Sequence, residues 1–273
     1  MQTEPTLLPS GSPLVEVPLP RDPLVRVVAQ AQFPQILSIL KAESVADFQK
    51  TLHSDYPHLD RHNVRNLKIG KDSGSNVSDT IIWRFSDQPV SMKWRVSLGT
   101  DFVALETCRY IDRDDFMSRL RKVLESVEEI FGPVMAQRLG LRYIDRLEGE
   151  ALCRIGDLVQ PGILGILQAD GDELEMLRKA TTHLMTEAQF VAEEGVIQGR
   201  WGNLPPNATY DPDLLQAIAE PSWVLDLDMF TSKAVPFKSK DLVVKTKVFA
   251  NHMYSVFRQM ITDEFLKFYG GTV

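Results

Sequence analysis

The stretch Trp94–Tyr110, WRVSLGTDFVALETCRY, decides the fold of this 273-residue chain. Its first half alternates apolar and polar residues up to Leu98, and the turn Gly99–Asp101 separates it from a second apolar run, Phe102–Tyr110. Alternation indicates a half-buried strand. A connection this short joins antiparallel strands, because a parallel crossover needs about a dozen residues or more. The stretch therefore predicts an antiparallel hairpin.

The residues before the hairpin predict more of the same sheet. Alternating Ile81, Trp83 and Phe85 precede the turn Asp87–Pro89 and indicate another antiparallel strand. Nearer the N-terminus we expect a strand over Val25–Phe33 ended by Pro34, a helix over Val45–Ser54 capped by Ser44, and a loop over Lys71–Ser78.

The residues after the hairpin predict a helix and one more strand. Apolar side chains recur at helical spacing over Phe116–Phe131, Asp112 or Asp114 can cap this helix, and Gly132-Pro133 can end it. The segment Gln137–Leu147 follows as a strand. These elements complete a β-α-β-β-β-α-β half.

The rest of the chain predicts a second half of similar outline. It holds an apolar stretch without a long helix (Leu158–Leu167), a hairpin (Ala180–Phe190 and Val196–Trp201), a polar loop (Asn203–Pro221), a strand (Trp223–Phe230) and a long helix (Asp241–Phe268). We therefore expect an α+β fold with predominantly antiparallel sheet. The expected organisation is an extended or disordered arm over 1–22 and two α+β halves over 23–149 and 150–273.

The composition indicates a soluble globular protein. Hydrophobic residues make up 44% and charged residues 25% of the chain, and the net charge is −7. An acidic chain cannot coat nucleic acid by general positive charge, although a local basic groove stays possible. Residues 1–20 do not read as a signal peptide, and no apolar run is long enough for a membrane helix, so we expect a cytoplasmic protein. Cys108 and Cys153 are expected to be buried thiols.

Four segments of the chain are similar to a known family. They are PLVRVVAQAQFPQILSI (Pro23–Ile39), WRVSLGTDFVALETCRY (Trp94–Tyr110), LGLRYIDR (Leu139–Arg146) and Leu225–Phe230 together with the helix through Ile261–Glu264. In this order they resemble a sporadically distributed prokaryotic family of proteins of about this length, and the resemblance covers nearly everything after residue 22.

The resemblance implies no established activity, cofactor or catalytic residue. The patchy occurrence of the family implies an accessory gene of a defence or toxin–antitoxin system. Arg26 departs from the family pattern, which usually has an acidic residue at this position, and the arm before Pro23 is longer than in the family.

A row of arginines is the first candidate site. Arg138, Arg142 and Arg146 share one face of the predicted strand Gln137–Leu147, with Gly140 among them, because side chains alternate along a strand. Guanidinium groups match phosphate and carboxylate geometry, so the row can bind an anion, a nucleotide or a phosphodiester. The alternative is that these arginines pair with carboxylates of a neighbouring strand or face water.

A pair of aspartates is the second candidate site. Asp226 and Asp228 share one face of the strand Trp223–Phe230, and two such carboxylates can hold a divalent cation. The alternative is that they pair with the arginine row across adjacent strands. His58 and His62, near Asp55 and Asp60, fit a polar loop better than a metal site.

These observations predict a binding or interaction protein without catalytic residues or a cofactor. The resemblance implies that it acts with another protein encoded nearby. The alternative is a nucleic-acid-binding or metal-dependent phosphodiester-processing protein that uses the arginine row and the aspartate pair.

Overall fold

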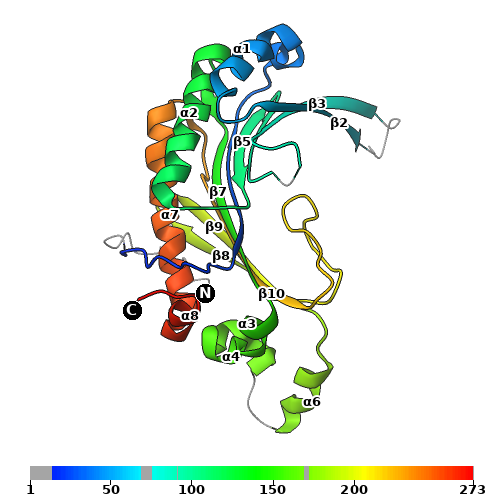
Figure 1. Ribbon diagram of the computed structural model, residues 1–273, viewed down its shortest axis with the longest axis vertical. Coiled ribbons are helices and arrows are strands. Elements are labelled where there is room, and N and C mark those ends of the chain that lie inside the picture. The colour runs from blue at the N-terminus through cyan, green and yellow to red at the C-terminus, as the bar shows by residue number, and fades with distance from the viewer. Residues whose placement is uncertain (1–13, 69–75, 91, 169–171, 273) are drawn as a thin grey trace, which may run out of the picture. The chain divides into compact units, whose positions relative to one another are not determined.

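The computed structural model describes residues 14–68, 76–90, 92–168 and 172–272 (Figure 1). The strands are β1 (Leu24–Gln32), β2 (His58–Lys68), β3 (Asn76–Ser86), β4 (Trp94–Gly99), β5 (Phe102–Thr107), β6 (Met135–Ala136), β7 (Arg138–Leu147), β8 (Leu184–Ala192), β9 (Gly195–Leu204), β10 (Ser222–Phe230) and β11 (Val235–Pro236). The helices are α1 (Ala42–Leu52), α2 (Arg113–Phe131), α3 (Gly149–Cys153), α4 (Ile155–Leu158), α5 (Pro161–Leu164), α6 (Asp172–Ala180), α7 (Ser239–Met260) and α8 (Asp263–Phe268), with 3-10 turns at Leu37–Leu40 and Gly165–Gln168.

Nine of these strands form one sheet in the order β2-β3-β4-β5-β1-β7-β10-β9-β8. The pairs β3·β4, β4·β5, β8·β9 and β9·β10 are all antiparallel. The deciding hairpin pairs Val96 with Leu105, so its apolar residues lie on one face. The predicted α+β fold with predominantly antiparallel sheet is confirmed.

The chain forms two compact units, and both are discontinuous in sequence. One unit contains the described parts of Met1–Arg26, Arg142–Phe230 and Val248–Val273. The other contains the described parts of Val27–Leu141 together with Thr231–Lys247. The division into 23–149 and 150–273 stays a prediction.

In the unit that contains Val27–Leu141, helices α1 and α2 pack on the apolar face of the sheet. The ring of Phe48 on α1 lies 5.5 Å from that of Phe85, and the ring of Phe116 on α2 lies 5.8 Å from that of Trp94. Helix α2 begins and ends as predicted: Asp112 caps it by accepting a hydrogen bond from the backbone N–H of Asp115, and Gly132 ends it with a left-handed φ of 58°.

The first part of α7 runs antiparallel beside α2 (Figure 1). The Lys247 ammonium lies 3.6 Å from the carboxylate of Asp114 near the start of α2, and the backbone N–H of Ser239 donates to Glu128 near its end. The hydrogen bonds from Ser239 are the main reason that the pKa of Glu128 lies below its usual value.

Three local predictions were wrong. The segment interpreted as a polar loop around His58 and His62 is strand β2, which pairs with β3 over its whole length. The last helix is broken at Ile261-Thr262, where Ile261 forms a β-bridge with Val159 and Thr262 caps α8. Helix α1 begins at Ala42 without a side-chain cap, so Ser44 lies inside the helix. Most of the predicted loop Lys71–Ser78 lies outside the described residues, and Asn76 already belongs to β3.

The prediction that the two cysteines are buried was also wrong. Cys108 and Cys153 are both exposed rather than buried. Cys108 directly follows β5 and its thiol donates to the carbonyl oxygen of Met92, while Cys153 ends the short helix α3. Apolar neighbours in sequence do not bury a side chain at the end of an element, because the chain turns there.

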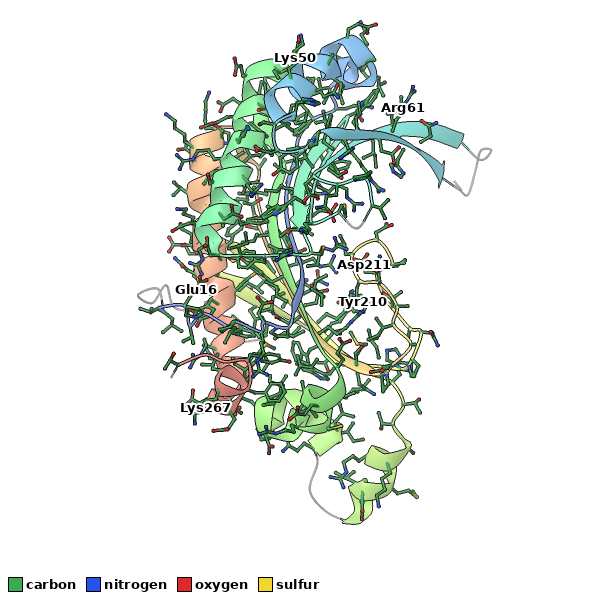
Figure 2. All side chains as sticks on the ribbon, in the orientation of Figure 1. Glu16, Lys50, Arg61, Tyr210, Asp211 and Lys267 are labelled. Carbon is green, nitrogen blue, oxygen red and sulfur yellow. The ribbon has the colours of Figure 1, made fainter. Side chains whose placement is uncertain are left out.

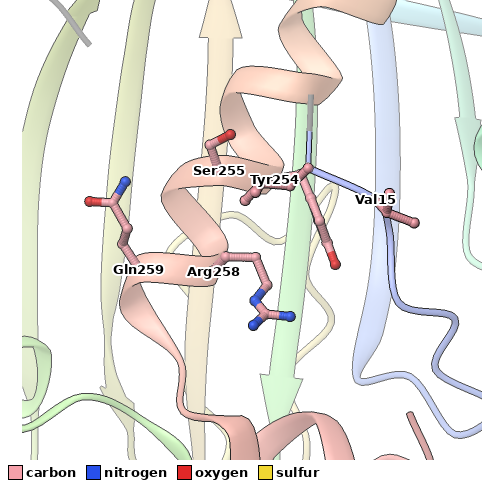
Figure 3. A pocket seen from close by; sticks show the side chains of 6 residues that line it. Val15, Tyr254, Ser255, Arg258 and Gln259 are labelled. Carbon is pink, nitrogen blue, oxygen red and sulfur yellow. The ribbon is translucent and has the colours of Figure 1, made fainter. Parts of the chain in front are cut away.

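The described part of the N-terminal arm docks on the last two helices. The backbone N–H of Val17 donates to the hydroxyl of Tyr254 on α7 at 2.9 Å, and the Arg21 guanidinium donates to the carbonyl of Phe268. Figure 3 shows Val15 of this segment beside α7. Arm and helix enclose a pocket of about 240 Å³ lined by Leu14, Val15, Tyr254, Ser255, Arg258 and Gln259.

None of the helices, as far as the chain is described, is long and apolar enough to cross a membrane.

Candidate functional site

The middle arginine of the predicted row is the centre of an ionic cluster. Arg142 Nε and Nη2 donate to the two carboxylate oxygens of Asp226 at 2.8 and 2.7 Å, a bidentate ion pair between β7 and β10. Its Nη1 donates to Asp211 at 2.9 Å. The hydroxyl of Tyr210 donates to the same Asp226 oxygen as Nη2, also at 2.9 Å. Thus Asp226 pairs with the arginine row, as the structural alternative predicted.

Burial makes this cluster tightly coupled. The side chain of Asp226 is 5% exposed and that of Arg142 is 19% exposed. Burial by itself lowers the pKa of Arg142, but the hydrogen bonds and charges of Asp226 and Asp211 outweigh it and raise the pKa above its usual value. Burial and the neighbouring Asp226 raise the pKa of Tyr210. Arg142 therefore stays charged and Tyr210 stays neutral at any physiological pH.

Tyr210 and Asp211 belong to the connection 205–221 between β9 and β10, which we call the clasp loop. Figure 2 shows both residues on this loop. Two more arginines donate to its backbone: Arg26 Nε to the carbonyl of Leu214 at 3.2 Å and Arg146 Nη2 to the carbonyl of Gln216 at 2.6 Å. Strands β1 and β7 thus hold the loop at three points.

An apolar cluster packs the clasp loop against the strands of the sheet. Leu215 is 1% exposed and packs with Ile144, Leu204 and Val224 of the strands. A hydrogen bond within the loop adds to this packing: the hydroxyl of Thr209 donates to the carbonyl of Leu215 at 2.6 Å. The clasp loop therefore has a small core of its own.

The remaining predicted site residues take different places. Arg146 is 9% exposed, and burial lowers its pKa. The guanidinium of Arg138 lies over Gly140, where a Cβ would approach Arg138 Nη1 to 2.5 Å. Within the described residues, no three His, Cys, Asp or Glu side chains gather into a metal-binding group. A cation at Asp226 and Asp228 stays a prediction.

Arg26 has a structural role. It is 8% exposed, and its hydrogen bond to Leu214 is one of the three arginine contacts with the clasp loop. An acidic residue cannot donate to a carbonyl when ionised, so the loop depends on the arginine at this position.

The opposite face of β7 carries a group that sequence reasoning missed. Asp145 lies between Ile144 and Arg146 but points to the other face, and it is 9% exposed. Burial first, and then the charges of Asp22 and Asp226, raise the pKa of Asp145 to about 8. The pKa of Asp22 is also raised by burial. The sequence did contain a signal for this group. Asp145 is the one carboxylate on a face of β7 that also carries Leu139, Leu141 and Leu147.

The histidines do not gather into a site. His62 Nε2 lies 2.8 Å from a carboxylate oxygen of Asp60 on β2, and His252 Nε2 lies 2.8 Å from Glu194 in the turn between β8 and β9. Each of these two histidines lies beside one carboxylate among the described residues, which is the geometry of an ordinary polar pair.

The resemblance to the prokaryotic family stays a prediction. No protein-family model, no curated protein and no solved structure matches the chain.

Proposed function

We propose that this chain is a non-catalytic binding protein that recognises a partner protein through the clasp loop. The observation that carries the proposal is the set of three arginine contacts from Arg26, Arg142 and Arg146 to this loop. Two antiparallel strands such as β9 and β10 need only about two to five connecting residues. Loops longer than about 12–15 residues are usually either functional or disordered, and the connection 205–221 is a long loop that the strands hold in place.

A loop held in one conformation is a good recognition surface. Binding costs less free energy when the backbone of the binding segment is already ordered. The clasp loop is exposed to solvent at Pro212, Asp213, Gln216 and Ala217. Its buried residue Leu215 packs against the strands.

The pairing of the two candidate sites supports binding over the alternative function. A phosphodiester-processing site would need the guanidinium of Arg142 for its substrate and the carboxylate of Asp226 for a metal ion. These two groups instead bind each other, and Tyr210 takes a further lone pair of Asp226. Opening the pair for a ligand would leave one buried charge without its partner, which is costly.

The family resemblance supports a specific kind of partner. It implies the protein product of a neighbouring gene in a defence or toxin–antitoxin system. The proposal needs neither a nucleic acid nor a cofactor.

The experiment is capture of the partner with a tagged chain expressed in its own cell. The variant Ala217→Arg places a bulky charge on the exposed side of the clasp loop without touching its core. The matched control is Val244→Arg on α7, where the native side chain is 61% exposed. We expect wild type and Val244→Arg to retain one stoichiometric protein, identified by mass spectrometry, and Ala217→Arg to lose it at an unchanged melting temperature. Equal recovery with both variants would contradict the proposal.

A further inference from the structure

Strand β8 stands at one end of the strand order, so it has a partner on one side only within the described part of the chain. Its hairpin with β9 turns over two residues, Glu193 and Glu194, because Ala192 pairs with Gly195. In such a hairpin the residues that flank the turn exchange hydrogen bonds, and every second residue before them does the same. The backbone N–H and C=O groups that point away from β9 are therefore those of Met185, Glu187, Gln189 and Val191.

The two edges of the sheet differ in their protection. Natural edge strands avoid unwanted pairing by means of charged residues, prolines, bulges or short length. Strand β2, at the other end of the order, has the sequence HLDRHNVRNLK with four Asp, Arg or Lys residues. Strand β8 has the sequence LMTEAQFVA, and its register with β9 runs without a bulge. Its one charge, Glu187, is paired with Arg200 of β9 at 2.6 Å.

The sequence of β8 is complementary to itself in the antiparallel direction. When two copies meet about a twofold axis at Ala188, all nine residues are paired and Glu187 lies opposite Gln189. Like charges do not meet, and apolar side chains meet one another at Met185 and Val191. The outward backbone groups also face each other in this register, whereas a shift by one residue would set outward groups against inward ones.

We propose that β8 pairs with β8 of a second copy of this chain and forms a twofold-symmetric dimer with a continuous sheet. A twofold axis makes the same surface serve both partners, which suits a self-complementary strand. The nearly neutral edge favours a second copy over a strongly charged partner strand, because it offers no excess charge to attract one. This surface is separate in sequence from the clasp loop, so the dimer does not depend on the proposed function.

The test measures mass in solution together with the exchange of the outward amides. Sedimentation of the full chain at about 50 μM should give twice the chain mass of 30.9 kDa. Gln189→Pro removes an outward N–H while it leaves the bonds to β9 in place, so we expect a folded monomer. Gln189→Ala keeps that N–H and should remain dimeric.

Hydrogen exchange of the wild type keeps the test valid if Gln189→Pro fails to fold. In the dimer the amides of Met185, Glu187, Gln189 and Val191 should exchange at least about tenfold more slowly than in the diluted monomer, because pairing protects them from water. A wild type that is monomeric at about 50 μM overturns the proposal. So does a dimer that folded Gln189→Pro retains, or one in which the outward amides exchange as fast as in the monomer.

Discussion

Two residues of β7, three positions apart, show opposite ways of keeping charge inside a protein. Arg142 points to one face of the strand and is neutralised by carboxylates, while Asp145 points to the other face and holds a proton instead. Both side chains are largely removed from water, so burial penalises charge in both cases. The difference lies in the neighbours, which are opposite charges for Arg142 and like charges, chiefly Asp22, for Asp145.

The comparison shows that the two faces respond differently to pH. The guanidinium of Arg142 keeps its charge throughout the neutral range, because its pKa lies above the usual value of an arginine. Asp145 has a pKa of about 8 in the folded chain and about 3.9 in an unfolded chain. At a pH between these two pKa values, the folded chain carries a proton on Asp145 that the unfolded chain has lost. At a pH above both values the folded chain also loses this proton, and the buried charge that results destabilises the fold.

The largest expected effect comes from breaking the ion pair. Arg142→Ala leaves the carboxylate of Asp226 buried without its bidentate partner, and we expect the free energy of unfolding to fall by about 3–5 kcal/mol. Denaturant unfolding at pH 7 measures it. The double variant Arg142→Ala, Asp226→Asn should lose less than the sum of the two single variants, since removal of the carboxylate relieves the unpaired charge. A melting curve unchanged in Arg142→Ala would show that the pair adds no net stability.

The next effect concerns the other face and depends on pH. Between about pH 4 and pH 8 the folded chain binds a proton at Asp145 that the unfolded chain has lost, so stability should fall as pH rises, by up to about 1.4 kcal/mol per pH unit from this group. Asp22, Asp226 and Tyr269 interact electrostatically with the same carboxyl. Asp145→Asn should flatten the decline and exceed the wild type in stability at pH 9. Parallel curves for the two proteins would mean that Asp145 is already ionised.

A smaller effect is expected from the hydroxyl of Tyr210. Tyr210→Phe removes one hydrogen bond to the Asp226 carboxylate and keeps the ring, over which Arg200 lies at 4.7 Å. Hydrogen bonds to charged groups contribute about 1.5–3 kcal/mol, and we expect a loss near the lower end because Arg142 remains. Thermal unfolding checks this value. A loss as large as that of Arg142→Ala would make the hydroxyl, rather than the guanidinium, the main partner of Asp226.

The smallest effect is expected at Asp211, which is the more exposed of the two carboxylates that pair with Arg142. Its side chain is 25% exposed, so water can replace part of what Arg142 provides. Asp211→Asn should cost about 1 kcal/mol or less, as exposed pairs usually do. The same denaturant measurement at low and high salt checks it, since the difference from wild type should shrink with salt.

The sequence predicted the parts of the fold that depend on local signals. Short turns defined the hairpins, and Gly132 with Pro133 defined the end of α2. Strand β2 was missed because its residues are mostly polar and lack the alternation of a strand with one buried face. The break at Ile261 was missed because the apolar pattern continues through it, and the β-bridge to Val159 that ends α7 is a long-range contact.

The candidate site was also predictable only where it depends on local signals. Alternation along the strand placed Arg142 and Arg146 on one face and Asp226 on a face that can meet them. The sequence does not state which strands are neighbours, so the pairing stayed one of two alternatives. Tyr210 and Asp211 could not be identified, because nothing local distinguishes a loop residue that reaches a distant arginine.

The discontinuity of the two compact units has a consequence for biosynthesis. One unit combines the described parts of Met1–Arg26, Arg142–Phe230 and Val248–Val273, and the other combines the described parts of Val27–Leu141 with Thr231–Lys247. A ribosome that adds about 5–20 residues per second exposes the earlier segments for several seconds before the later ones emerge. Neither unit can close in that interval, so the earlier segments are exposed to proteases and aggregation until the later ones have emerged.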